Sequence, residues 1–293
     1  MEATKLSLLF CLSGFLGHAQ TRGVVKDSIS GNPVAYASIW VENENIRTTA
    51  EENGEFIIGT SDKSKNLVLS ALGYQKKTVR ASDAAQVFLS PEPFELNEVL
   101  VADRKEKIKI EIGKTKNKIA EAFDNGPRID AKYFPFLPEY KKTPWIKSAT
   151  IAADSKIEDA IVRMQLYTVD ENGFPGHELL DKDYIVTLKK GISKQEADLA
   201  DFNLEMPKNG VFVVLERLLV EKNKLSATVT DYNSNTTRTK ISYCPLVLYN
   251  AVEKEFLFSF SGGRWIRQSR AELNLHSASR TIYEPALTLV LTN

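Results

Sequence analysis

Short apolar segments separated by turn residues fill the stretch from Arg22 to Val101. The apolar segments are Gly23–Val25, Ala37–Val41, Glu55–Ile58 and Leu67–Leu72. Segments of this length, bounded by glycine, proline and asparagine, predict β-strands, because a helix needs a longer periodic run. This stretch therefore predicts a small all-β domain.

Individual turns refine that prediction. Asn53-Gly54 supplies the positive φ angles of a tight turn, which predicts a hairpin between residues 46–49 and 56–58. Pro33 opens a loosely alternating run, Val34–Val41, which we expect to be a half-buried strand. Gly73 should end the apolar run that precedes it, and Gln75–Arg80 should return as a polar edge strand.

A family resemblance is carried by an ordered set of short motifs. They are Gly23-Val24-Val25, Asp27, Pro33-Val34, Ala37-Ser38-Ile39, Thr48-Thr49, Asn53-Gly54-Glu55-Phe56, Leu69, Leu72-Gly73-Tyr74, Val87-Phe88-Leu89 and Leu96-Asn97-Glu98-Val99-Leu100-Val101. Residues 21–101 thereby resemble the carboxypeptidase-regulatory-like domain. The resemblance implies a prealbumin-like Greek-key sandwich, common at the start of exported Gram-negative envelope proteins. That domain is non-catalytic, so the resemblance implies no peptidase activity.

The first 20 residues predict a secretory signal peptide. Lys5 supplies a positive start, Leu6–Leu16 is an apolar run too short to span a bilayer, and Gly17-His18-Ala19 offers small residues for cleavage. We therefore expect an exported chain, in the periplasm, associated with the outer membrane or secreted. No later segment is apolar and long enough to predict a transmembrane helix.

Composition narrows the partner. The chain has 38 basic and 38 acidic residues, so no overall field attracts nucleic acid, and an envelope protein or a glycan is the expected partner. Cys244 is the one cysteine after the signal peptide and cannot form an intrachain disulfide. Stability must then come from packing.

The segment 102–126 predicts a basic linker or an edge strand. Lys107–Ile112 alternates strictly, and the lysines suit either a charged edge that resists pairing or a patch for an acidic partner. Residues 127–150 are rich in proline and aromatic residues, which argues against a central strand and favours an extended crossing segment.

From residue 146 onward, strand patterns recur to the end of the chain. Val162–Tyr167 alternates, Gly210–Glu216 is apolar on both faces and should be a central strand, and Leu287–Leu291 should be the last strand. The segment 193–202 leaves a strand and a short helical turn both open, because Ser193-Lys194-Gln195-Glu196 is a capping-box pattern. The fold class is all-β, with a jelly-roll-like sandwich over residues 127–293, similar in architecture to carbohydrate-binding modules.

The residues of the mature chain do not assemble a catalytic or metal site. His177 and His276 are its two histidines, and neither lies in the His-x-x-Glu spacing that a zinc carboxypeptidase needs. Cys244 precedes a proline in an apolar run and should be buried and inert. Asp231–Asn235 has calcium-like oxygen spacing but lacks the later glycine and glutamate of a calcium loop. We expect no catalytic residue, no cofactor and no metal.

Five aromatic residues are the candidate ligand surface: Tyr133, Phe136, Tyr140, Trp145 and Trp265. Exposed, coplanar rings would stack on a sugar, whereas buried rings would plug the sandwich. We predict a non-catalytic binding or scaffold protein of the interaction or adhesion type. A glycan-binding module is the alternative, and a hydrolase is a second alternative that would need a histidine beside a serine or cysteine in a pocket.

Overall fold

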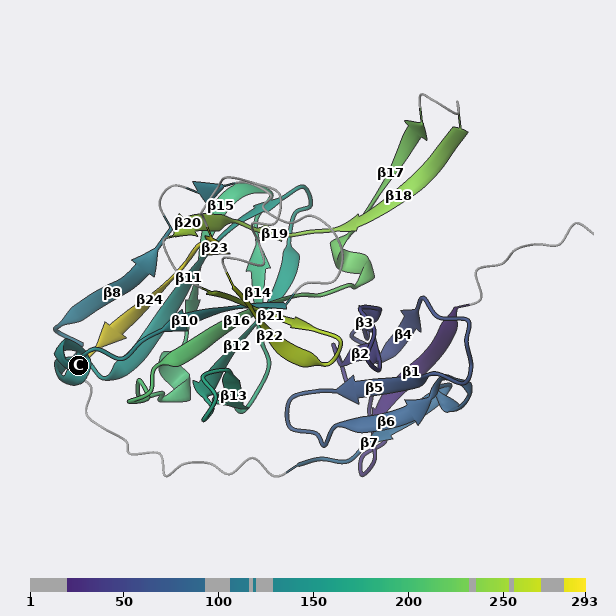
Figure 1. Ribbon diagram of the computed structural model, residues 1–293, viewed down its shortest axis with the longest axis horizontal. Coiled ribbons are helices and arrows are strands. Elements are labelled where there is room, and N and C mark those ends of the chain that lie inside the picture. Colours follow the sequence, from purple (N-terminus) through teal and green to yellow (C-terminus); the bar gives the residue numbers. More distant parts are fainter. Residues whose placement is uncertain are drawn as a thin grey trace, which may run out of the picture.

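The computed structural model describes residues 20–92, 106–115, 118–119, 129–231, 236–252, 256–269 and 282–293. The chain is all-β, as predicted, with four short 3-10 helices at Ala81–Asp83, Pro138–Lys142, Ala200–Phe202 and Glu221–Asn223. Figure 1 shows the strands of the first part of the chain gathered apart from those of the second part. The predicted signal peptide lies outside the described residues, apart from Gln20.

The first domain is a sandwich of two sheets. Its strands are β1 (Thr21–Asp27), β2 (Ser38–Val41), β3 (Arg47–Thr49), β4 (Glu55–Ile58), β5 (Asn66–Ser70), β6 (Lys77–Arg80) and β7 (Gln86–Leu89). One sheet has the order β4-β1-β7 and the other β3-β2-β5-β6. Their inner faces enclose one core, which includes Val25, Ile39, Phe56, Leu69 and Leu89. As predicted, β6 is an edge strand after Gly73.

Two local predictions in this domain are wrong. Gly54 does adopt a positive φ of 78°, but β3 pairs with β2 and β4 pairs with β1, so the turn crosses between sheets and closes no hairpin. The strand expected from Val34 begins only at Ser38, because Tyr36 takes a φ of 56°. A left-handed residue breaks the extended backbone that a strand requires.

The second domain has two main sheets. Its strands are β8 (Lys109–Lys114), β9 (Lys118–Ile119), β10 (Ile129–Phe134), β11 (Trp145–Ser155), β12 (Ala160–Val169), β13 (Pro175–Glu178), β14 (Tyr184–Leu188), β15 (Gly191–Asp198), β16 (Val211–Arg217), β17 (Lys224–Asp231), β18 (Thr236–Tyr243), β19 (Leu246–Val247), β20 (Tyr249–Val252), β21 (Phe256–Ser261), β22 (Arg264–Ser269), β23 (Ile282–Pro285) and β24 (Leu287–Thr292). A seven-stranded sheet runs β13-β12-β16-β10-β21-β22, with β14 on β12. A five-stranded sheet runs β15-β11-β24-β8, with β19 on β11. A jelly-roll connectivity stays a prediction.

The central strand β16 is apolar on both faces, as predicted. Val211, Val213 and Leu215 enter the large core between the two sheets. Phe212 and Val214 point to the opposite, outer face, where a second apolar cluster lies. Side chains alternate across a strand, so a strand buried on both sides shows no polar period.

The prediction that residues 127–150 avoid a central strand is wrong for β10. This strand pairs with β16 on one side and β21 on the other. Pro135 follows its last residue, Phe134, so the prolines interrupt no hydrogen-bonded ladder. The sandwich also takes in β8, the predicted basic edge strand, which pairs with β24.

The undecided segment 193–202 contains both elements that its sequence allows. Residues up to Asp198 belong to β15, and a 3-10 turn follows at Ala200–Phe202. Among the residues that the structure describes, no helix is long and apolar enough to cross a membrane.

Candidate functional site

The two domains meet through a buried ionic cluster. Glu216, on the outer face of β16, accepts hydrogen bonds from Arg47 and from the Ser38 hydroxyl, the latter at 2.6 Å. Its second oxygen lies 3.1 Å from Nη1 of Arg163, which also bonds the carbonyl of Tyr36. Asp183 completes the cluster, 3.2 Å from Nε of Arg163. Two cations and two anions from the two domains therefore balance one another at a largely buried site.

The cluster controls the ionisation of its own carboxylate. Burial raises the pKa of Glu216, but the charges of Arg47 and Arg163 and the Ser38 hydrogen bond outweigh it, so this pKa lies below the ordinary value. Burial instead raises the pKa of Asp183, against the opposing charge of Arg163. Glu216 is thus the anion around which the junction is organised.

Backbone and apolar contacts extend the junction on either side of the cluster. The amide of Leu219 donates to the Thr49 hydroxyl at 3.1 Å, and the amide of Glu221 donates to the Glu51 carboxylate at 2.9 Å. Tyr36 packs against a cluster of the second domain that contains Ile161 and Leu218. The first domain is therefore seated on the second through side chains that neither domain could bury alone.

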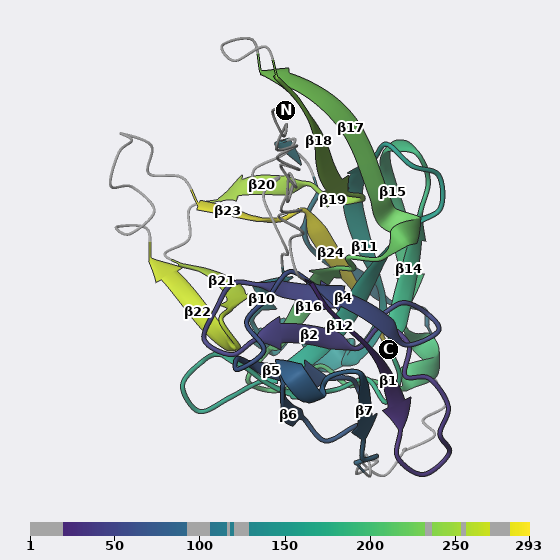
Figure 2. The ribbon, with the colours of Figure 1, turned by 90° about the vertical axis from the view of Figure 1, so that its right-hand side faces the viewer.

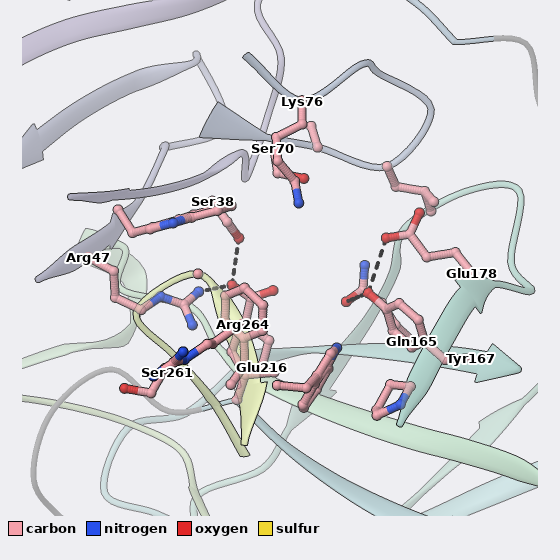
Figure 3. Close-up of a pocket in the computed structure, with 18 of the residues that line it drawn as sticks. Ser38, Arg47, Ser70, Lys76, Gln165, Tyr167, Glu178, Glu216, Ser261 and Arg264 are labelled. Atoms are coloured by element: carbon pink, nitrogen blue, oxygen red, sulfur yellow. Dashed lines mark hydrogen bonds and ion pairs between the residues drawn. The ribbon is translucent and has the colours of Figure 1, made fainter. Parts of the chain in front are cut away.

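A cavity of about 450 Å³ opens beside the ionic cluster, with walls from both domains. Figure 3 shows Arg47, Ser38 and Glu216 on one wall, and Gln165, Tyr167 and Glu178 on the opposite one. The outer face of the seven-stranded sheet borders the cavity through β12, where Arg163, Gln165 and Tyr167 lie at alternate positions. Its size falls within the range of about 300–1,000 Å³ typical of small-molecule sites, which often lie between domains.

Aromatic rings line much of this cavity. Trp40 meets Phe260 edge to face at 5.7 Å, across the domain boundary. Phe260 contacts Trp265 at 5.4 Å, and Trp265 contacts Tyr167 at 6.2 Å, with interplanar angles of 73° and 75°. The rings stand at steep angles to one another. They therefore enclose a small volume and do not form a flat platform.

Polar groups occupy the wall around Tyr167. Its hydroxyl lies 3.0 Å from Oε1 of Glu178 and 3.2 Å from Oε1 of Gln165. The single proton of this hydroxyl can be donated to only one of the two oxygens, so the Gln165 amide and the Glu178 carboxylate keep hydrogen-bonding capacity on the cavity wall. Burial is also the main cause that raises the pKa of Glu178. The cavity can thus offer both a donor and an acceptor to a ligand.

The five predicted ring residues do not form one surface. Trp265 lines the cavity, while Tyr133 packs its ring on Phe212 and donates its hydroxyl to the Asn209 carbonyl. Phe136 and Tyr140 contact each other at 84°, and Tyr140 is buried in the inter-sheet core. Trp145 opens β11 and pairs with Thr292. These five rings do not form a coplanar platform, because they point to different faces of the sandwich.

The remaining candidates for chemistry lie apart. His177 is exposed on β13 at the rim of the cavity, and Cys244 is buried and free. His276 and most of the calcium-like segment, residues 232–235, lie outside the described residues. Within the described ranges, no three His, Cys, Asp or Glu side chains converge as a metal site would require.

Comparison with known families places the first domain. Residues 21–101 match the CarboxypepD_reg-like domain family. The match confirms the resemblance seen in the motifs from Gly23 to Val101, and the CarboxypepD_reg-like domain is of a regulatory, non-catalytic type. It includes Ser38, Trp40 and Arg47, the side chains with which this domain meets the second one. No curated protein matches the chain.

Sequence patterns did not indicate the junction residues. The alternation of Val162–Tyr167 predicted a strand, but it did not indicate that both of its polar residues, Arg163 and Gln165, are buried. The one available signal was the pairing of Arg163 with Glu216 across β12 and β16, two charged residues inside long apolar strands. Charged residues are seldom fully buried unless they are paired with an opposite charge. An Arg–Glu pair inside two apolar strands therefore indicates that another part of the protein covers this face.

A second feature projects from the body of the protein. Strands β17 and β18, which we call the arm, pair only with each other among the described strands. Figures 1 and 2 show the arm extending beyond the rest of the second domain. Residues 226–230 and 236–241 are exposed on both faces of the arm. A two-stranded ribbon of this kind is only marginally stable alone, so it is suited to completion by a partner.

Proposed function

We propose that this protein is an exported, non-catalytic binding protein of the cell envelope, and that its arm pairs with a strand of a protein partner. The single observation that carries the proposal is the arm itself, a ribbon to which no third strand is paired among the described residues. An open edge presents unpaired N–H and C=O groups, onto which a partner can add a strand. The matched CarboxypepD_reg-like domain supports the non-catalytic part of the proposal.

The composition of the arm supports pairing with a protein strand. One face carries Thr228 opposite Thr239 and Thr230 opposite Thr237. Ile241 extends that face and is 52% exposed. β-Branched residues favour the extended backbone, and this face has no charge at these positions to repel an added strand.

Shortening the arm tests this proposal. Residues 226–241 are replaced by Asn-Gly, which joins Leu225 to Ser242 in their existing register with a two-residue turn. We expect the melting temperature to change by less than about 2 °C, because the removed residues are exposed. Proteins retained from envelope extract by the intact mature chain should be lost from the shortened one.

Amide hydrogen exchange then locates the contact. In a complex with a retained partner, exchange should slow along β17 or β18 and stay unchanged on β6, an edge strand of the first domain. Partners that bind the shortened chain equally well, or protection confined to other strands, would refute the proposal.

Export is tested separately on the chain recovered from envelope fractions. The apolar run Leu6–Leu16 and the small residues after it support removal of the first 19 or 20 residues. Mass spectrometry should then find a mature N-terminus at Gln20 or Thr21. Recovery of the full-length chain from the soluble cell interior would contradict export.

A further inference from the structure

We propose that the cavity between the two domains binds a short neutral saccharide. The inference is independent of the arm, which lies elsewhere on the molecule (Figure 1). It starts from a polar side chain on the cavity wall. Gln165 is 6% exposed, and its amide lies 3.2 Å from the Tyr167 hydroxyl, which also lies 3.0 Å from the Glu178 carboxylate.

The Tyr167 hydroxyl has one proton and can donate it to only one of these two side chains, so the Gln165 amide keeps hydrogen-bonding capacity that a ligand in the cavity can use. Figure 3 shows Gln165 beside Tyr167, facing the space that Glu178 borders from the same side. Glu178 uses Oε1 with Tyr167 and has a second oxygen with no partner among the described residues. One wall therefore presents a carboxamide next to a carboxylate oxygen.

A sugar hydroxyl satisfies both groups at once, because it accepts one hydrogen bond and donates another. A carboxylate or phosphate group could accept a hydrogen bond from Gln165, but the negative charge of Glu178 would repel it. The charges around the cavity support a neutral ligand, since four cationic and four anionic side chains line it. They are Arg47, Lys76, Arg163 and Arg264, and Glu44, Glu92, Glu178 and Glu216.

The aromatic lining supplies the apolar half of the recognition. A pyranose ring has C–H faces that pack on aromatic rings, while its hydroxyls point outward to polar groups. Trp265 and Trp40 are joined through Phe260, so rings from both domains border the same space. Because these rings are steeply inclined to one another, they suit an enclosed mono- or disaccharide better than a long chain lying on a surface.

Tryptophan fluorescence can report binding directly. The chain has three tryptophans, and two of them, Trp40 and Trp265, line the cavity. Replacing the third, as Trp145→Phe, leaves emission only from the cavity. The mature Trp145→Phe protein is titrated with a panel of neutral mono- to tetrasaccharides and, for comparison, with uronic acids of the same size.

We expect a saturable emission change with at least one neutral saccharide of the panel. Gln165→Met retains the side-chain length. It should lower the affinity for that saccharide about tenfold, because one hydrogen bond is lost. Glu178→Gln should also lower this affinity. Lys141→Met, a substitution at an exposed residue of the 3-10 helix Pro138–Lys142, should leave the affinity unchanged. Melting temperatures of the variants show that each one is folded.

Three outcomes would overturn the inference. They are no emission change with any neutral saccharide, binding that Gln165→Met and Glu178→Gln leave unaffected, and binding restricted to the uronic acids. In each case partner capture through the arm remains a separate question, because the arm residues do not line the cavity.

Discussion

Replacing Arg163 by methionine is expected to lower the free energy of unfolding by about 3–5 kcal/mol. The guanidinium is buried, and its removal leaves Asp183 without its cation and Glu216 with Arg47 alone. Burying a carboxylate without compensation is expensive, whereas the intact cluster pays that cost through mutual attraction. Urea unfolding of the mature chain, followed by circular dichroism, measures the change.

An exposed ion pair provides the matched control. Lys224 lies 2.6 Å from Glu221, but Glu221 is largely exposed. Lys224→Met should therefore change stability by no more than about 1 kcal/mol, because water already solvates both charges. Equal effects of Arg163→Met and Lys224→Met would show that burial at the junction contributes nothing.

The ionic cluster also makes the junction sensitive to acid. The pKa of Glu216 is lower in the folded protein than its ordinary value of 4.5. A lowered carboxylate pKa stabilises the folded state above pH 4.5, and this stabilisation is lost as the pH falls through the folded-state pKa. The stability difference between the natural chain and Glu216→Gln should then be full at pH 7 and shrink below pH 4.5. A difference that stays constant down to pH 3 would contradict this account.

The second large effect is expected from Gly23→Ala. A Cβ at Gly23 would lie 1.8 Å from the carbonyl oxygen of Ala84 and 2.8 Å from the Phe56 ring. Neither can yield easily, because Ala84 is buried next to β7, which pairs with β1, and Phe56 belongs to the core. We expect a loss of about 3 kcal/mol or more, at the upper end of the cost of overpacking.

Gly59→Ala is the control for Gly23→Ala. Nothing lies within 4 Å of a Cβ at Gly59, which is exposed just after β4. The substitution should be neutral or slightly stabilising, because it restricts the unfolded chain. Thermal unfolding of the two variants compares them, and a Gly23→Ala protein as stable as Gly59→Ala would show that β1 and β7 do not pack as described.

Local patterns predicted strands well where one residue type decides the backbone. Gly73 follows β5 at the predicted end of its apolar run, and it adopts a φ of 79°, which glycine reaches without steric cost. By contrast, Asn53-Gly54 predicted a turn correctly and its partner strands incorrectly. A turn sequence specifies a local backbone geometry and carries no information about which sheet receives the next strand.

The inward faces of the two sandwiches are determined by sequence alone. Ile39 and Val41 on β2, like Val211 and Val213 on β16, repeat every second residue and must leave water wherever the strands come to lie. Only the tertiary structure decided whether the opposite faces of these strands are buried or exposed. Arg163 and Gln165 occupy the polar positions of an alternating strand, and Trp40 lies on the face of β2 opposite Ile39; all three are buried because one domain covers the other. Alternation marks two faces of a strand but cannot reveal a second layer above the polar one, so the ionic cluster and the cavity beside it arise only when the domains pack.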